Sequence, residues 1–116
     1  MLLVEDDEAN REALVEFLRD EGYQVLAAEN GARALELLRE GAAPGLILLD
    51  LMMPVLNAWG FRDEQRRDPA LAGIPVILFS AGHRLEDEAR RFGAAAVLRK
   101  PPDLEELLAQ VARHCR

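Results

Sequence analysis

The chain has 116 residues, of which half are hydrophobic and 30% are charged, and its formal net charge is −7. This length suits one domain, covering residues 1–116, with a core of its own. An acidic chain is a poor direct partner for nucleic acid, because contacts with phosphates need a basic face. We find neither a signal peptide nor an apolar run near the roughly 20 residues of a membrane span, so we expect a cytoplasmic protein.

Five short apolar runs alternate along the chain with longer amphipathic stretches. The runs show little internal alternation of polar and apolar residues, which is typical of strands buried on both faces. They lie at residues 2–4, 24–27, 46–49, 76–79 and 96–98. Each is therefore predicted to form a strand.

The stretches that follow these runs have helical periodicity. Three of them are followed by a glycine that predicts a C-terminal helix end, at Gly22, Gly41 and Gly93. Asp68-Pro69 ends another stretch, at residues 58–67. The last one places Leu104, Leu107, Leu108 and Val111 at the i, i+3, i+4, i+7 spacing of one helical face.

Five strand–helix repeats predict an α/β fold with a parallel sheet, helices on both faces and right-handed crossovers. The pattern fits the flavodoxin-like (βα)5 doubly wound sandwich with strand order 2-1-3-4-5. The strand order is inferred from the statistics of known folds, since periodicity alone does not give it.

Polar residues follow the predicted strands at the edge where such sheets bind ligands. Glu5, Asp6 and Asp7 follow the first strand. The third strand ends at Asp50, the fourth at Ser80, and the fifth at Arg99-Lys100. Because strands one, three and four are neighbours in the proposed order, these side chains should converge.

Several carboxylates in one place repel one another, and a hard divalent cation with oxygen ligands resolves the repulsion. Mg²⁺ keeps several waters and takes one or two carboxylates directly, which leaves a carboxylate oxygen to act as a nucleophile toward phosphorus. A hydroxyl and an ammonium group would then stabilise the phosphoryl oxygens.

Each of these residues also has an ordinary structural explanation. Asp7 is equally well placed to cap the helix that begins near Glu8. Asp50 alone could be a turn residue, and Ser80 and Lys100 could be loop residues. The four together, each at the carboxyl end of a predicted strand, favour a functional site.

Four segments resemble the signature of response-regulator receiver domains, the CheY-like modules of two-component signal transduction. They are LLVEDDE at 2–8, LILLDLMMP at 46–54, PVILFSA at 75–81 and VLRKPPD at 97–103. The resemblance covers essentially the whole chain. It implies a phosphoprotein in which a sensor histidine kinase or a phosphotransfer protein passes a phosphoryl group from its phosphohistidine to Asp50.

The resemblance also implies roles for the other residues. Asp6, Asp7 and Asp50 would bind Mg²⁺, directly or through water, together with the main-chain carbonyl of Met52. Ser80 would be the switch hydroxyl. Such a domain is not an enzyme, because it catalyses only its own phosphorylation and dephosphorylation.

Lys100 would contact the acceptor carboxylate and the phosphoryl group, and a cis peptide often follows this lysine in the family, here at Pro101. Phosphorylation would alter the face built by the fourth helix, the fifth strand and the fifth helix. That face includes the charged run at 86–91, which is either a solvated helix surface or part of a homodimer contact.

The chain departs from the family pattern at several positions. Val97 stands where the family commonly has an aromatic residue that rotates with the switch hydroxyl, and Asn57-Ala58 replaces a common Asp-Gly pair. The segment from Ser80 to Lys100 is slightly short. Met52, two residues past the acceptor, and Gly82, two residues past Ser80, do not position an attacking water, so we hypothesise a moderately long-lived phosphorylated state.

Three other functions are alternatives to this one. A flavin or nucleotide module would need a Gly-rich or hydroxyl-rich phosphate loop, but an acidic loop follows the first strand. An aspartyl-phosphate hydrolase would carry an acid at position 52, which is Met52. A degenerate receiver that only docks partners remains the alternative for the output step, because Val97 removes the usual aromatic coupling.

Overall fold

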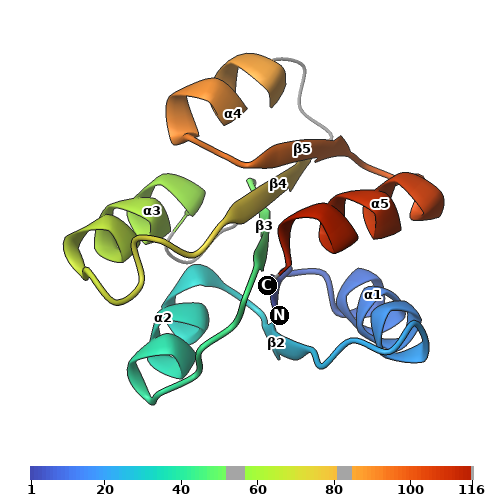
Figure 1. Cartoon of the computed structure of the whole chain (residues 1–116), viewed down its shortest axis with the longest axis horizontal. Helices are drawn as coiled ribbons and strands as arrows, with labels where there is room; N and C mark the ends of the chain where they lie inside the picture. Colours follow the sequence, from blue (N-terminus) through green and yellow to red (C-terminus); the bar gives the residue numbers. More distant parts are fainter. Residues whose placement is uncertain (52–56, 81–84, 116) are drawn as a thin grey trace.

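The computed structural model describes residues 1–51, 57–80 and 85–115. Within these residues, five strands and five helices alternate along the chain (Figure 1). The strands are β1 (Leu2–Val4), β2 (Leu26–Ala28), β3 (Ile47–Asp50), β4 (Val76–Ser80) and β5 (Ala96–Arg99). The helices are α1 (Glu8–Asp20), α2 (Gly31–Arg39), α3 (Ala58–Arg67), α4 (Leu85–Phe92) and α5 (Leu104–His114).

The strands form one parallel sheet in the order β2-β1-β3-β4-β5, which confirms the predicted fold class and strand order. In the middle of the sheet, Leu48 of β3 pairs with Leu3 of β1 on one side and with Ile77 of β4 on the other. The chain order of the strands reverses between β1 and β3. The carboxyl ends of these two strands are therefore where a ligand site is expected.

A hydrophobic core covers each face of the sheet. The helices α2, α3 and α4 lie on one side, and α1 and α5 lie on the other (Figure 1). Ile47 and Leu49 of β3 join the first core, and Leu48 joins the second. Each fully buried leucine or phenylalanine contributes about 1.5–3 kcal/mol. Burial on both sides explains why the strands read as continuous apolar runs.

Helix ends follow the predicted signals. Gly22, Gly41 and Gly93 have φ values of 96°, 106° and 77°, in the left-handed region, and they follow α1, α2 and α4. The start of β2 differs from the prediction: the strand begins at Leu26, although the apolar run begins at residue 24. Leu26 is the partner of Leu2, the first residue of β1, so residues 24 and 25 have no β1 strand residue to pair with.

Two arginines of α3 hold the C-terminal end of α4. Arg62 donates from Nε to the carbonyl of Phe92 (3.1 Å) and from Nη2 to the carbonyl of Gly93 (3.0 Å). Arg62 also donates from Nη1 to Oε1 of Gln65 (2.8 Å), and Arg66 donates to the same Phe92 carbonyl (3.0 Å). Burial, with the neighbouring Arg66, lowers the pKa of Arg62. These contacts satisfy carbonyls that the last turn of a helix leaves without partners.

Among the described residues, no helix combines the length and the apolar character that a membrane crossing requires.

Candidate functional site

The carboxyl ends of the strands bring together most of the residues expected at the site. Glu5 directly follows β1, Asp50 and Ser80 are the last residues of β3 and β4, and Lys100 directly follows β5. Glu5, Asp50 and Ser80 are almost completely buried. Charged side chains are seldom buried so deeply without a partner. A cluster of buried ionisable groups is also a candidate functional site.

Lys100 joins the two buried carboxylates. Its Nζ donates to both oxygens of Glu5, at 3.0 and 2.8 Å, and to Oδ2 of Asp50 at 2.9 Å. The same ammonium lies 4.9 Å from the centre of the Phe79 ring. The main-chain N–H of Lys100 donates to the carbonyl of Ser80 (3.1 Å), so the backbone holds these two residues side by side. Lys100 is the only lysine in the sequence, where every other basic side chain apart from histidine is an arginine.

Charge and burial shift the pKa values of this cluster. Burial raises the pKa of the Glu5 carboxyl, and Asp50 adds to the shift, although the hydrogen bond from Lys100 opposes it. Burial alone would lower the pKa of the Lys100 ammonium, but the hydrogen bonds and charges of Glu5 and Asp50 outweigh burial and raise it. Lys100 therefore stays charged at neutral pH, and one ammonium group serves two carboxylates.

Three carboxylates form a cluster that fits a hard divalent cation. Oxygen atoms of Glu5, Asp6 and Asp50 all lie within 4.8 Å of one another. Mg²⁺ and Ca²⁺ both bind carboxylate oxygens. Mg²⁺ needs only one or two carboxylates, because water molecules fill the rest of its coordination sphere. Asp6 is exposed whereas Glu5 and Asp50 are buried, so the cluster is open to solvent on the Asp6 side.

The structure places Asp7 differently from Asp6. Oδ1 of Asp7 accepts the main-chain N–H of Asn10 at 3.0 Å, which makes Asp7 the N-cap of α1. Glu5, to which the resemblance assigned no role, occupies the cluster with Asp6 and Asp50. The available signal was its place directly after β1, since the end of a buried strand is the position from which Asp50 also reaches the site.

Two positions that the sequence analysis singled out lie outside the described residues: Met52, expected to offer a carbonyl to the metal, and Gly82, two positions after Ser80. The peptide bond between Lys100 and Pro101 is cis, as the resemblance implied. Beside it, a hollow of about 570 Å³ lies between α1 and the start of α5 and is lined mainly by apolar side chains, including Leu14, Phe79 and Leu104.

Val97 is half-buried on β5 and lines a second hollow, of about 420 Å³, against α4. Next to it, Arg99 of β5 donates to both carboxylate oxygens of Glu86 on α4, at 2.9 and 2.8 Å. Arg99 is also the partner of Ser80 across the β4–β5 pair. An ion pair thus joins α4 to the strand residue opposite Ser80, two positions after Val97 on the same strand.

Comparison with known proteins identifies the family. Residues 1–112 match the family described as "Response regulator receiver domain". The chain is 34% identical to Protein PilH of Pseudomonas aeruginosa over 113 residues, covering 96% of this chain and 93% of that protein. It is 35% identical to the DNA-binding dual master transcriptional regulator RpaA of Synechocystis, covering 96% of this chain.

The chain spans 46% of RpaA, and about half the length of several other curated relatives. Among solved structures, the chemotaxis protein CheY4 of Vibrio cholerae superposes with a TM-score of 0.88 at 28% sequence identity. That alignment covers 97% of this chain and 95% of CheY4.

Proposed function

The chain belongs to the response regulator receiver family, and we propose from this premise that Asp50 is its phosphate acceptor. The observation that carries the proposal is the three-way contact of Lys100 with Glu5 and Asp50 at the end of β3. An ammonium group that touches the acceptor carboxylate in the resting state is already placed for the phosphoryl oxygens. Lysine suits this role because its compact ammonium acts as a point charge.

In the proposed reaction a carboxylate oxygen of Asp50 attacks the phosphorus of a partner's phosphohistidine. The new bond joins this oxygen to phosphorus, the phosphorus–nitrogen bond breaks, and its electron pair returns to the imidazole. Lys100 then neutralises part of the charge on the transferred group, and the hydroxyl of Ser80 donates a hydrogen bond to it. The chain returns to its resting state when the acyl phosphate is hydrolysed, so it modifies only itself.

We propose that Asp6 and Asp50 hold Mg²⁺ together with the main-chain carbonyl of Met52, and that Glu5 is the third carboxylate of the site. When bound, Mg²⁺ supplies positive charge to the phosphoryl oxygens during transfer. Glu5 is preferred to Asp7 because Glu5 lies in the carboxylate cluster, whereas Asp7 caps α1. Asp7 would then influence the ion only by fixing the start of the helix.

The proposed partner is a sensor histidine kinase or a phosphotransfer protein in the cytoplasm. The apolar hollow is lined in part by Lys100, which contacts Asp50, and it gives a partner a surface to bury. The net charge of −7 makes the domain a poor direct partner for nucleic acid, because contacts with phosphates need a basic face. Where longer relatives continue beyond the receiver, such output would belong to their other domains.

We further propose that the output face comprises α4, β5 and α5, and that the Arg99–Glu86 pair takes part in switching. Both side chains are about half exposed, at 53% and 56%, and solvent screens an ion pair of this kind strongly, so it contributes little to stability. Such a contact can break at little cost when Ser80, opposite Arg99, turns toward a phosphoryl group. The same face is the candidate surface for a homodimer.

Intact mass spectrometry tests the proposed acceptor. The wild type and Asp50→Asn are incubated with acetyl phosphate and MgCl₂, and each is repeated with EDTA. The wild type should gain one phosphoryl group with Mg²⁺ and little with EDTA, and Asp50→Asn should gain none. A folded wild type that gains nothing would replace this proposal with a domain that only docks partners.

A further inference from the structure

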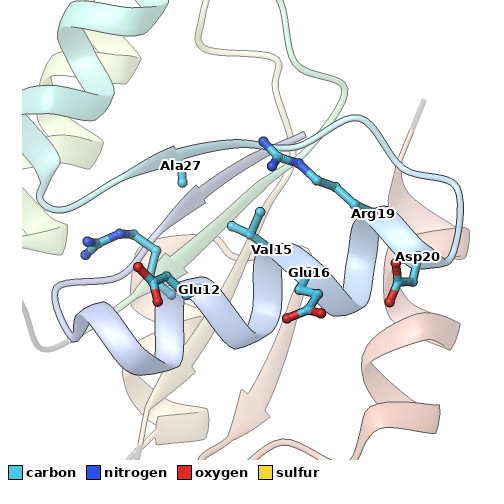
Figure 2. A pocket seen from close by; sticks show the side chains of 7 residues that line it. Glu12, Val15, Glu16, Arg19, Asp20 and Ala27 are labelled. Carbon is cyan, nitrogen blue, oxygen red and sulfur yellow. The ribbon is translucent and has the colours of Figure 1, made fainter.

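Two arginines of α1 line the same hollow, of about 460 Å³, between this helix and β2. Figure 2 shows Arg19 reaching from α1 across this space toward the chain that enters β2. Arg19 donates from Nη2 to the carbonyl of Val25 at 2.9 Å. Arg11 makes the same kind of contact near the N-terminal end of α1. Its Nη1 donates to the carbonyl of Glu5 at 3.0 Å and to the carbonyl of Asp6 at 3.4 Å. The two arginines are alike in chemistry but differ in which segment they hold.

The segment held by Arg11 is the acidic loop between β1 and α1, which contains only residues 5–7. Its main chain is fixed at several points, since the N–H of Glu5 donates to the carbonyl of Ala28 (3.1 Å) and Asp7 caps the helix. Arg11 adds the contacts to the Glu5 and Asp6 carbonyls. In so short a loop, the orientation of these two peptide planes determines where the Glu5 and Asp6 side chains point.

The positive charge of Arg11 also favours a fixed position of this acidic loop. The loop and the first residue of α1 place four acidic side chains in a row, at residues 5–8. Carboxylates so close together repel one another, and a loose loop would let them separate. The guanidinium of Arg11 carries a permanent positive charge, so its hold on the loop is independent of pH across the neutral range.

We propose that Arg11 is a positioning residue for divalent-cation binding: by holding the carbonyls of Glu5 and Asp6, it fixes the two carboxylates in the geometry that receives the ion. This inference rests on the proposed function, because it assumes that the cluster of Glu5, Asp6 and Asp50 binds Mg²⁺. Arg11 itself touches neither the ion nor the phosphoryl group. Residues that orient metal ligands in this way typically change metal affinity by 10- to 100-fold when they are replaced.

The test compares Mg²⁺ affinity, measured by isothermal titration calorimetry, in the wild type, Arg11→Ala, Arg11→Lys and Arg19→Ala. Arg19→Ala is a matched control, since it also removes one positive charge of α1 and a guanidinium that donates to a main-chain carbonyl, in its case that of Val25. We expect Arg11→Ala to bind Mg²⁺ about tenfold more weakly. Arg11→Lys, which keeps the charge and can donate to one carbonyl, should fall between, and Arg19→Ala should match the wild type.

A second measurement separates positioning from catalysis. The rate of phosphorylation by acetyl phosphate is followed as a function of Mg²⁺ concentration. Arg11→Ala should need about tenfold more Mg²⁺ for half-maximal rate and should reach the wild-type rate at saturation. A lower rate at saturating Mg²⁺ would overturn the inference, because it would mean that Arg11 acts in the chemical step.

The remaining outcomes are also decisive. Equal affinities for Arg11→Ala and the wild type, or equal losses for Arg11→Ala and Arg19→Ala, would refute the role of Arg11 and leave the proposed function intact. A folded wild type that binds no Mg²⁺ would refute the metal site itself, and this inference with it. Thermal unfolding identifies any variant that is not folded, and Arg11→Lys carries the comparison if Arg11→Ala does not fold.

Discussion

Replacing Lys100 with methionine removes the ammonium group that joins Glu5 to Asp50 and leaves an unbranched stem of similar length. Oxygens of the two carboxylates lie within 4.8 Å of each other, where two full charges repel by about 3.5 kcal/mol at an effective dielectric constant of about 20. Removing one partner of a buried ion pair commonly costs about 3–5 kcal/mol. We therefore expect metal-free Lys100→Met to lose about 3 kcal/mol of stability at about pH 8.

This loss should depend on pH, and its sign follows from the pKa of Glu5. Burial already raises this pKa above 4.5, and removal of Lys100 eliminates the contacts that oppose the shift. The folded variant then binds more protons than the unfolded chain above pH 4.5, so its stability falls as the pH rises through this window. The deficit relative to the wild type should be largest at about pH 8 and should shrink toward about pH 5.

Urea unfolding in EDTA at a series of pH values measures the effect. The wild type, Lys100→Met, Asp50→Asn and the double variant form a double-mutant cycle. The Asp50→Asn background lacks the negative charge of Asp50. Lys100→Met should therefore lower the free energy of unfolding less in this background, and the loss should depend less on pH. An equal loss at every pH and in both backgrounds would refute the reasoning, because it would show that Lys100 contributes packing and no charge compensation.

Three further predictions concern the metal ligands, the α3–α4 contact and the phosphorylated state. Glu5→Gln should weaken Mg²⁺ binding more than about tenfold, whereas Asp7→Asn, which keeps the helix cap, should change it less than about twofold, as calorimetry can establish. Arg62→Met should lose about 3 kcal/mol in urea unfolding, and Arg66→Met, which is exposed, about 1 kcal/mol or less; equal losses would contradict the geometry. With Met52 unable to direct a water, the acyl phosphate should persist for minutes or longer in a hydrolysis time course, and decay within seconds would exclude a long-lived state.

Most of the fold could be predicted from local pattern. The apolar run at residues 46–49 is buried on two sides, and Gly93 takes the left-handed conformation that ends α4. The start of β2 could not be read from its own residues, because it is determined by where Leu2 begins the neighbouring strand. Pairing between strands is a tertiary property, so it cannot be predicted from the hydrophobicity of one strand alone.

The candidate site was only partly predictable. Asp50, Ser80 and Lys100 could be predicted from their places at the carboxyl ends of strands, but Glu5 and Asp7 are both acids in one acidic run. A helix cap and a metal ligand require the same side chain, so a shift of one position along the run changes the assignment. The structure distinguishes the two residues through the capping hydrogen bond of Asp7 and the burial of Glu5.

The burial of Arg62 had no sequence signal. A charged residue within a helical pattern is normally assigned to the solvent side. Its environment depends on the carbonyls of Phe92 and Gly93, about thirty residues later in the chain. Only the packing of α3 against the end of α4 brings these acceptors within reach.

The central claim is that Asp50 carries the phosphoryl group, and direct mapping of the modified residue tests it most sharply. The chain is phosphorylated with acetyl phosphate and Mg²⁺, reduced with borohydride, digested and sequenced by tandem mass spectrometry. Reduction converts an aspartyl phosphate to homoserine, and we predict homoserine at position 50 alone. Homoserine at Asp6 or Asp7, or a phosphorylated wild type with unmodified Asp50, would contradict the account.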